Sequence, residues 1–185
     1  MKKLIVLISL LLSVSVFALS AEGTDSRSAF DCESAIGVAY YSPDIGGGSD
    51  NFLGGLCYQH WINEKTGIEF GGAISWDPNS TYKPLDYNIY CEGDYILYQS
   101  EISHAFASRL YTWGLVGHTG AIESEYDMET ESYKETGYRP NFRAGIGFGF
   151  DLIFYKHVSV PLKFGFTGSL TGAGFTFGGG IKYIW

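Results

Sequence analysis

Four segments of the chain alternate strictly between bulky apolar residues and small or charged ones. In residues 158–170, Leu162, Phe164 and Phe166 fall on one face of an extended chain, while Lys163 and Gly165 fall on the other. A period of two is that of a β-strand with two unlike faces, whereas a helix would repeat every 3.6 residues. The same pattern covers residues 67–76, 141–152 and 173–185. With 25 Gly, 14 Tyr and 13 Phe against 5 Pro, the sequence predicts an all-β fold.

The remaining segments extend this pattern to eight expected strands. Their connections alternate between short ones (63–65, 107–108, 156–157) and long polar ones (43–50, 77–86, 123–139), and the final turn near Thr171 and Gly172 is short. An up-and-down meander places every second turn at the same end, so we expect a short-turn end, which also holds both termini, and a long-loop end. The expected strands are 34–42, 51–62, 66–76, 87–106, 109–122, 140–155, 158–170 and 173–185.

The character of the two faces predicts which one points outward. A soluble barrel buries its bulky apolar face and exposes a charged one. Here the second face is mostly Gly, Ser and Thr, which suits the narrow lumen of eight strands and leaves the bulky face for lipid. We therefore expect an eight-stranded antiparallel up-and-down transmembrane β-barrel, with a soluble sandwich as the alternative. Its interfacial aromatic girdles would comprise Tyr40, Trp76, Tyr111, Trp113, Tyr183 and Trp185.

The first residues have the order of a secretory signal. Lys2 and Lys3 precede an apolar run that reaches Leu19, and small residues follow it. We expect a signal peptide over 1–20, a lead-in over 21–33 and the barrel over 34–185; an uncleaved membrane anchor is the alternative. The formal net charge of −8 would repel a phosphate backbone, which argues against nucleic acid as a partner.

The chain ends in a pattern of its own, Gly180-x-x-Tyr183-x-Trp185. It resembles the terminal β-signal of Gram-negative outer-membrane proteins, and residues 34–185 resemble the small eight-stranded barrels of the OmpA, OmpX and OmpW type. The resemblance implies recognition of Gly180, Tyr183 and Trp185 by the barrel-assembly machinery. It also implies contact with outer-membrane lipid and lipopolysaccharide, with periplasmic termini and extracellular long loops.

Six charged residues fall on the inward face of the expected strands. Because isolated charges are costly to bury, we expect them to pair across the lumen and plug it, with a hydrated polar interior as the alternative. They are Glu69, Glu101, Arg143, Asp151, Lys163 and Lys182. Residues 87–106 do not keep one alternation, since Ile96 and Tyr98 fall on one face and Tyr95 and Leu97 on the other, which indicates a bulge.

No motif for catalysis or metal binding stands out. His118 and Ser124 lie near the long-loop end, as in barrels that remodel lipid A, but the His-x-Ser-Asn pattern of the deacylases is absent. The cysteines Cys32, Cys57 and Cys91 are odd in number and form no CxxC pair, so at most one internal disulfide can form. We expect no enzyme activity, no cofactor and no metal site.

The third long connection, 123–139, carries six acids interleaved with tyrosines. Such alternation can extend two strands above the membrane, with an edge open to strand addition, or it can be a plain solvated loop. The expected interaction residues are Glu125, Tyr126, Asp127, Glu129, Glu131 and Tyr133. We expect a structural or adhesion-type surface protein. The alternatives are a narrow transporter of small hydrophobic molecules, for which only Leu53 and Val116 are expected as apolar lumen residues, and a lipid A-modifying enzyme.

Overall fold

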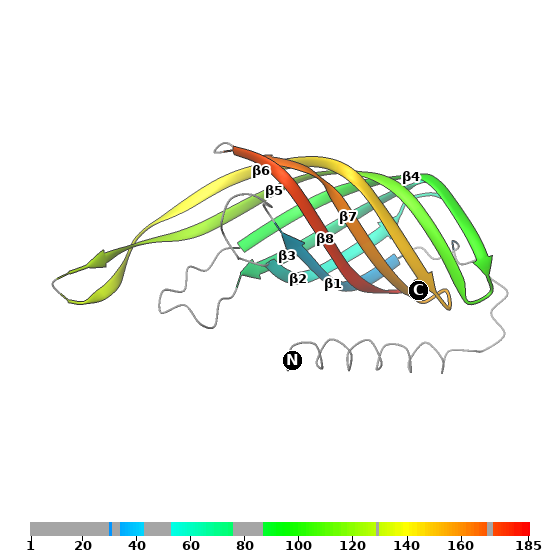
Figure 1. Cartoon of the computed structure of the whole chain (residues 1–185), viewed down its shortest axis with the longest axis horizontal. Coiled ribbons are helices and arrows are strands. Elements are labelled where there is room, and N and C mark those ends of the chain that lie inside the picture. Colours follow the sequence, from blue (N-terminus) through cyan, green and yellow to red (C-terminus); the bar gives the residue numbers. More distant parts are fainter. Residues whose placement is uncertain (1–29, 31–33, 43–52, 76–86, 129, 170–171) are drawn as a thin grey trace.

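The computed structural model describes residues 30, 34–42, 53–75, 87–128, 130–169 and 172–185. Its strands form one closed barrel in chain order, each antiparallel to the next, and β1 pairs with β8 (Figure 1). This confirms the expected eight-stranded antiparallel up-and-down barrel. The strands are β1 (Ser34–Ser42), β2 (Leu53–Trp61), β3 (Thr66–Ser75), β4 (Tyr87–Ser103), β5 (Phe106–Asp127), β6 (Ser132–Phe154), β7 (Val158–Ser169) and β8 (Gly172–Ile184).

The seam between the first and last strands is fully hydrogen-bonded. Ala35 pairs with Ile184, and the pairing runs along the seam to Ser42 and Phe177. The Trp185 amide donates to the Ser34 carbonyl at 3.0 Å, beyond the last paired residues. No strand edge is therefore left open along the barrel wall between these residues. Figure 1 shows the C-terminus at the end of the barrel opposite the long hairpin.

The outer wall of the barrel is apolar. Exposed bulky side chains come from β2, β3, β6 and β7, and Leu56, Phe70, Ile146 and Phe166 are each more than half exposed. For the described residues this confirms the expected outward face of 67–76, 141–152, 158–170 and 173–185. A continuous apolar surface of this kind is what a barrel presents to hydrocarbon. Among the described residues no helix has the length and hydropathy needed to cross a membrane.

The expected facing of β5 is wrong. Tyr111 and Trp113, assigned to an interfacial girdle, are buried inside the barrel at 0% and 2% exposure. Val116, expected in the lumen, is 63% exposed on the outside. The reason is that β6 and β7 present glycines to the lumen. The space above these glycines is filled by large side chains from β5. Tyr183 and Trp185 do lie on the outer wall near the C-terminus, and Tyr40 is half-exposed.

Two irregularities in β4 explain why its alternation is broken. The register with β5 shifts between Ile96 and Tyr98 and again between Glu101 and Ser103. The first shift confirms the expected bulge, and it leaves Leu97 and Tyr98 both exposed. The turn into β5 then falls at residues 104–105, three residues before its expected place.

β5 and β6 are the longest strands, and they continue past the barrel as a hairpin (Figure 1). We define this hairpin as residues 121–139. Residues 121–127 pair with residues of β6 as far as Arg139, and seven residues of antiparallel strand span about 24 Å. Of the two alternatives for 123–139, the structure has the extended strands, so the expected strand bounds of 122 and 140 were too short. Glu131, in the turn, has a φ of 50°.

Several expectations concern residues outside the described ranges. They include the signal peptide over 1–20, the lead-in over 21–33 apart from Phe30, and the residues Cys32, Trp76 and Glu129.

Candidate functional site

A group of charged side chains around Glu69 is buried inside the barrel. This residue of β3 accepts a hydrogen bond from the Tyr90 hydroxyl at 2.8 Å and one from Lys163 Nζ at 3.1 Å. Its second oxygen is bound by Lys182. Glu69 is 1% exposed, and both lysines are almost as deeply buried. Since β3 and the strands β7 and β8 stand on opposite sides of the closed sheet, these ion pairs cross the lumen.

The group extends along β2 and β4. Lys163 also pairs with Glu92. Lys182 Nζ donates to Gln59 Oε1 at 3.0 Å, and Gln59 Nε2 donates to Asp94 Oδ2 at 2.7 Å. Every one of these side chains is at least nine-tenths buried. We call Gln59, Glu69, Tyr90, Glu92, Asp94, Lys163 and Lys182 the lumen network; it ties five strands to one another.

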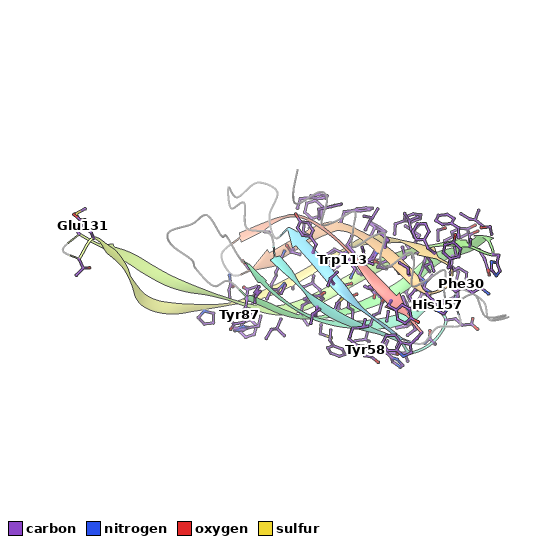
Figure 2. All side chains as sticks on the ribbon, turned by 90° about the horizontal axis from the view of Figure 1, so that it is seen from below. Phe30, Tyr58, Tyr87, Trp113, Glu131 and His157 are labelled. Carbon is purple, nitrogen blue, oxygen red and sulfur yellow. The ribbon has the colours of Figure 1, made fainter. Side chains whose placement is uncertain are left out.

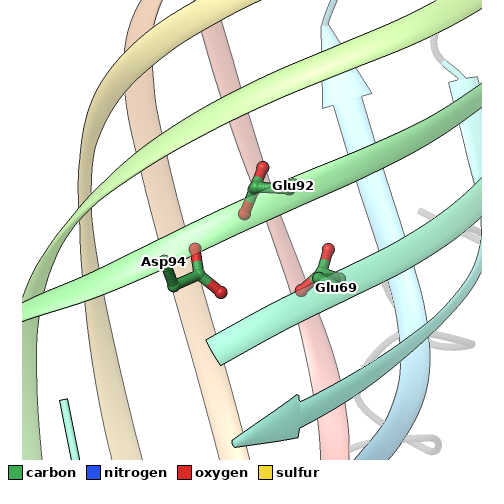
Figure 3. Close-up of side chains that lie close together, drawn as sticks. All are labelled: Glu69, Glu92 and Asp94. Carbon is green, nitrogen blue, oxygen red and sulfur yellow. The ribbon is translucent and has the colours of Figure 1, made fainter. Parts of the chain in front are cut away.

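Acids outnumber bases in the lumen network. Ligand oxygens of Glu69, Glu92 and Asp94 lie within 4.8 Å of one another, and Figure 3 shows the three carboxylates converging from β3 and β4. Carboxylates are the ligands that calcium and magnesium prefer. Here, however, Lys163 and Lys182 point their ammonium groups at the same oxygens, so a divalent ion would meet like charge. The geometry is that of an internal ion-pair network.

A second pair lies closer to the short-turn end. Arg109 Nη1 is 3.8 Å from Asp151 Oδ2, and the two residues face each other across β5 and β6. The Arg109 guanidinium also lies 4.2 Å from the ring centre of Trp61 and 5.5 Å from that of Phe30. This cation–π arrangement places aromatic rings against the charge within the barrel.

Aromatic rings of β5 take up space beside the charges, since Trp113 is the register partner of Asp94. A Cβ atom added to Gly147 or Gly165 would lie 2.6–2.7 Å from Cζ2 of Trp113, closer than carbon atoms approach in real structures. Gly149 stands in the same relation to Tyr111. The Trp113 indole donates to the carbonyl of Phe148 at 3.0 Å. The Tyr111 ring thus requires a glycine at 149, whereas Gly147 and Gly165 are crowded by backbone carbonyls of the neighbouring strand as well as by Trp113. We call Tyr111 and Trp113 the aromatic plug.

Of the six charged residues expected to plug the lumen, the structure brings three together: Glu69, Lys163 and Lys182. Asp151 points inward but pairs with Arg109, and Arg143 points inward and donates to Thr167 Oγ1 at 2.6 Å. Glu101 is a correction, because it is exposed. The bulges in β4 interrupt the alternation of its two faces. Counting every second residue from Tyr98 and Ile102 therefore assigns Glu101 to the wrong face.

Sequence reasoning missed four polar or charged residues of the lumen network: Gln59, Tyr90, Glu92 and Asp94. It also missed Arg109, which the wrong facing of β5 placed outside. A signal was present in β4, where Asn88, Tyr90, Glu92 and Asp94 follow one another at every second position. Glu92 of β4 is the register partner of Glu69 of β3, so the two carboxylates lie side by side on the inner wall.

The terminal residues expected to form an assembly signal lie at the barrel seam. Gly180 faces Ala39 of β1, and a Cβ there would collide with the Val38 carbonyl. Tyr183 and Trp185 lie outside, 6.3 Å apart between ring centres. Tyr58 adds a further ring at 6.4 Å from Trp185, and His157 stacks on Tyr183. Figure 2 shows Tyr58 and His157 at the end of the barrel away from the hairpin.

The expected interaction residues fall on the hairpin. Glu125, Tyr126 and Asp127 are in β5, opposite Lys134, Tyr133 and Ser132 of β6, while Glu131 lies in the turn (Figure 2). The register therefore places two tyrosines directly across from each other at the tip.

His118 lies apart from the lumen network, whereas Cys57 is buried on the same face of β2 as Gln59, beside the network. His118 Nδ1 is 3.2 Å from the Tyr87 hydroxyl, and its ring meets Phe142 edge-on at 5.3 Å between centres. Among the described residues, Cys57 and Cys91 are free thiols, the first buried and the second half-buried.

These features define a small, closed, antiparallel barrel with an apolar exterior and charged side chains buried in its interior. Solved structures with this fold are small eight-stranded outer-membrane barrels. The N-terminal β-barrel domain of Pseudomonas aeruginosa OprF matches with a TM-score of 0.59 and 13% identity, over 83% of this chain and 97% of that one. Outer membrane protein H (OprH) of P. aeruginosa matches at 0.58 and 12% identity, over 83% and 99%. Neisserial surface protein A matches at 0.51 and 11% identity, over 87% and 100%.

No family model matches the sequence, and no curated protein matches it. At these identities the structural likeness establishes the fold, and function has to be argued from the chain's own residues.

Proposed function

We propose that the chain is an integral protein of the bacterial outer membrane that acts at the cell surface through its β5–β6 hairpin. The apolar outer wall supports the membrane placement, because in water this surface would carry a large hydrophobic cost. Aromatic rings at the C-terminal end of the wall, among them Tyr183 and Trp185, suit an interface with lipid headgroups.

The observation that carries the surface role is the extension of the hairpin. β4 pairs with β5 only as far as Gly120, and β7 pairs with β6 only as far as Arg143. Beyond these points, within the described ranges, β5 and β6 pair only with each other. Each outer edge of the hairpin then offers backbone N–H and C=O groups to an added strand. The six acids in residues 123–139 favour a partner with a basic surface.

The side chains buried in the lumen support a closed lumen and a structural role for the barrel. Ion pairs of the lumen network cross it, and the aromatic plug packs against glycines of β6 and β7. A transporter of small hydrophobic molecules would need an apolar channel along the same path. We therefore expect no stable, large conductance from the monomer in planar bilayers, and such a conductance would contradict the closed lumen.

The surface role can be tested by shortening the hairpin. Ile122 and Tyr138 are register partners, so residues 123–137 can be replaced by Asn-Gly, a two-residue turn that suits an antiparallel hairpin. We expect this variant to keep its gel shift on boiling while cells that display it lose binding to host cells or extracellular proteins. A full-length variant with residues 123–137 shuffled is the matched control for composition. Equal binding by the shortened variant would contradict the proposal.

Orientation is part of the same proposal. We infer export through a signal peptide cleaved after Ser20, recognition of Gly180, Tyr183 and Trp185 by the assembly machinery, periplasmic termini and an extracellular hairpin in contact with lipopolysaccharide. The mass of the mature protein tests the cleavage, and protease added to intact cells should cut only in the exposed loops. Cutting at the termini instead would show the opposite orientation.

We propose no catalytic role. His118 lies on the outer wall, with the Tyr87 hydroxyl at its Nδ1 and the Phe142 ring beside it. These contacts are as well explained by side-chain packing at the rim of the barrel as by a catalytic role. Removal of acyl chains from lipid A by the purified protein, abolished by His118→Ala, would overturn this view.

A further inference from the structure

The outer wall has a groove on the side formed by β4 to β8, close to the long-loop end. It has a volume of about 620 Å³. Its floor is made of small residues, with Gly93 and Gly114 facing each other in one row and Cys91 in the next. Its walls include Val116, Ile146 and Phe166, which are 63–71% exposed. The groove is thus a hollow in the belt of bulky side chains.

The register of the strands shows what lies above the groove. On β5, the outward residues run from Gly114 through Val116 to His118 toward the hairpin. His118 pairs with Ile89 of β4 and with Phe142 of β6, so the row after Val116 closes the groove toward the loop end. Figure 2 shows Tyr87, whose hydroxyl meets His118, where the hairpin leaves the barrel. A polar pair therefore stands at the head of an apolar groove.

We propose that this groove binds one acyl chain of a lipid in the leaflet at the loop end, with the lipid's ester or headgroup oxygens at His118 and Tyr87. The inference rests on the proposed membrane placement. Position argues for a lipid, because the groove opens on the same belt that faces hydrocarbon and its polar end coincides with the rim. Nδ1 of His118 is held by Tyr87, so we assign the contact with a ligand's donor or acceptor to Nε2.

Shape argues against a second copy of the barrel as the occupant. Barrels are convex, so two of them touch along a narrow line, whereas the floor at Gly93 and Gly114 lies below the exposed side chains of Val116 and Ile146. A single hydrocarbon chain can follow such a floor and contact both walls. Close packing against small residues is also how apolar segments gain van der Waals contact within a membrane, where the hydrophobic effect gives no preference.

The two floor glycines allow the groove to be filled without disturbing the barrel. A Cβ added at Gly93 meets no atom within 4 Å, and one at Gly114 comes no closer than 3.9 Å to the Gly145 carbonyl. Gly93→Leu with Gly114→Leu should therefore fold and occupy the groove. Gly54→Leu is the matched control, because Gly54 is also exposed and has open space at its Cβ, but it lies on β2, away from the groove.

The test uses the full chain in phosphatidylcholine vesicles that contain a phospholipid with a diazirine midway along one acyl chain. After illumination, the labelled residues are mapped by mass spectrometry. We expect labelling to concentrate on Cys91, Val116 and Ile146, compared with Leu56 on another part of the wall. The double leucine variant should lose this enrichment, Gly54→Leu should keep it, and His118→Phe, which retains a ring beside Phe142, should reduce it.

Other results would overturn the proposal in distinguishable ways. Even labelling around the wall, or enrichment that persists in the double leucine variant, would show that no lipid is selected. Cross-links between two chains at the groove would assign it to a second copy. Absence of label everywhere, together with no gel shift on boiling, would instead contradict the membrane placement.

Discussion

The side chains inside the barrel divide into two halves that are held in opposite ways. In the charged half, Glu69 is joined to Lys163 and Lys182 by ion pairs that reach across the barrel. In the aromatic half, Trp113 and Tyr111 pack against glycines of β6 and β7, and the shape of the rings decides the fit. The charged half depends on partners that must all be present, because an unpaired buried charge is costly. The aromatic half depends on volume, so small changes in size should act gradually.

The largest effect should come from breaking the charged half. Glu69→Ala leaves Lys182 buried, with Gln59 as its remaining described partner, and it removes one of the two carboxylates near Lys163. We expect the free energy of unfolding in lipid vesicles to fall by about 3–5 kcal/mol, measured by urea titration. Adding Lys182→Met should restore part of the loss, because the stranded charge is then gone.

Glu101→Ala is the control for this prediction. Glu101 was expected to share the lumen with Glu69, but it is exposed, so its loss should change stability by no more than about 0.5 kcal/mol. Equal effects of the two substitutions would mean that the charged half owes its stability to something other than the lumen network.

A somewhat smaller effect should follow from emptying the aromatic half. Trp113→Ala removes a side chain that is 2% exposed and leaves a cavity beside Gly147 and Gly165. We expect a loss of about 3 kcal/mol, without any stranded charge. If the aromatic plug also blocks passage, planar-bilayer recordings should show brief openings in this variant that Glu101→Ala lacks.

The smallest of the three effects should come from overfilling the same half. Gly149→Val would drive a side chain into the Tyr111 ring, at a cost of about 1–3 kcal/mol. Gly93→Val, on the lipid side with nothing within 4 Å, should be close to neutral. A neutral Gly149→Val would show that the Tyr111 ring can move aside and that the aromatic half is loosely packed.

The sequence predicted the outside of this molecule far better than its inside. In β7 and β8, strict alternation correctly predicted that the phenylalanines point outward. A one-residue slip would have reversed the two faces of the strand. That logic fails in β5, where rings are on the inner face and Gly114 on the outer. Whether a strand points large or small side chains into the lumen depends on the side chains of the strands that it faces. The sequence of one strand alone therefore does not predict it.

The candidate site shows the same limit. Glu69, Lys163 and Lys182 could be placed inward because each lies among small residues on a clearly alternating strand. Glu92 and Asp94 were missed because the bulge beyond Ile96 obscured the parity of β4. The hairpin was only one of two alternatives for 123–139, because alternating acids and tyrosines suit a solvated loop as well as two extended strands.

The seam between β1 and β8 determines the order in which the barrel can form. Contacts between the first and last strands, like the pairing of Lys182 with Glu69, connect parts of the chain that are far apart in sequence, and such a topology is intrinsically slow to complete. Until β8 is in place, β1 is an open edge and Glu69 lacks one of its two lysines. Closure of the sheet and dehydration of the lumen charges should therefore be a single late event, in which a chain truncated before Gly172 could not take part.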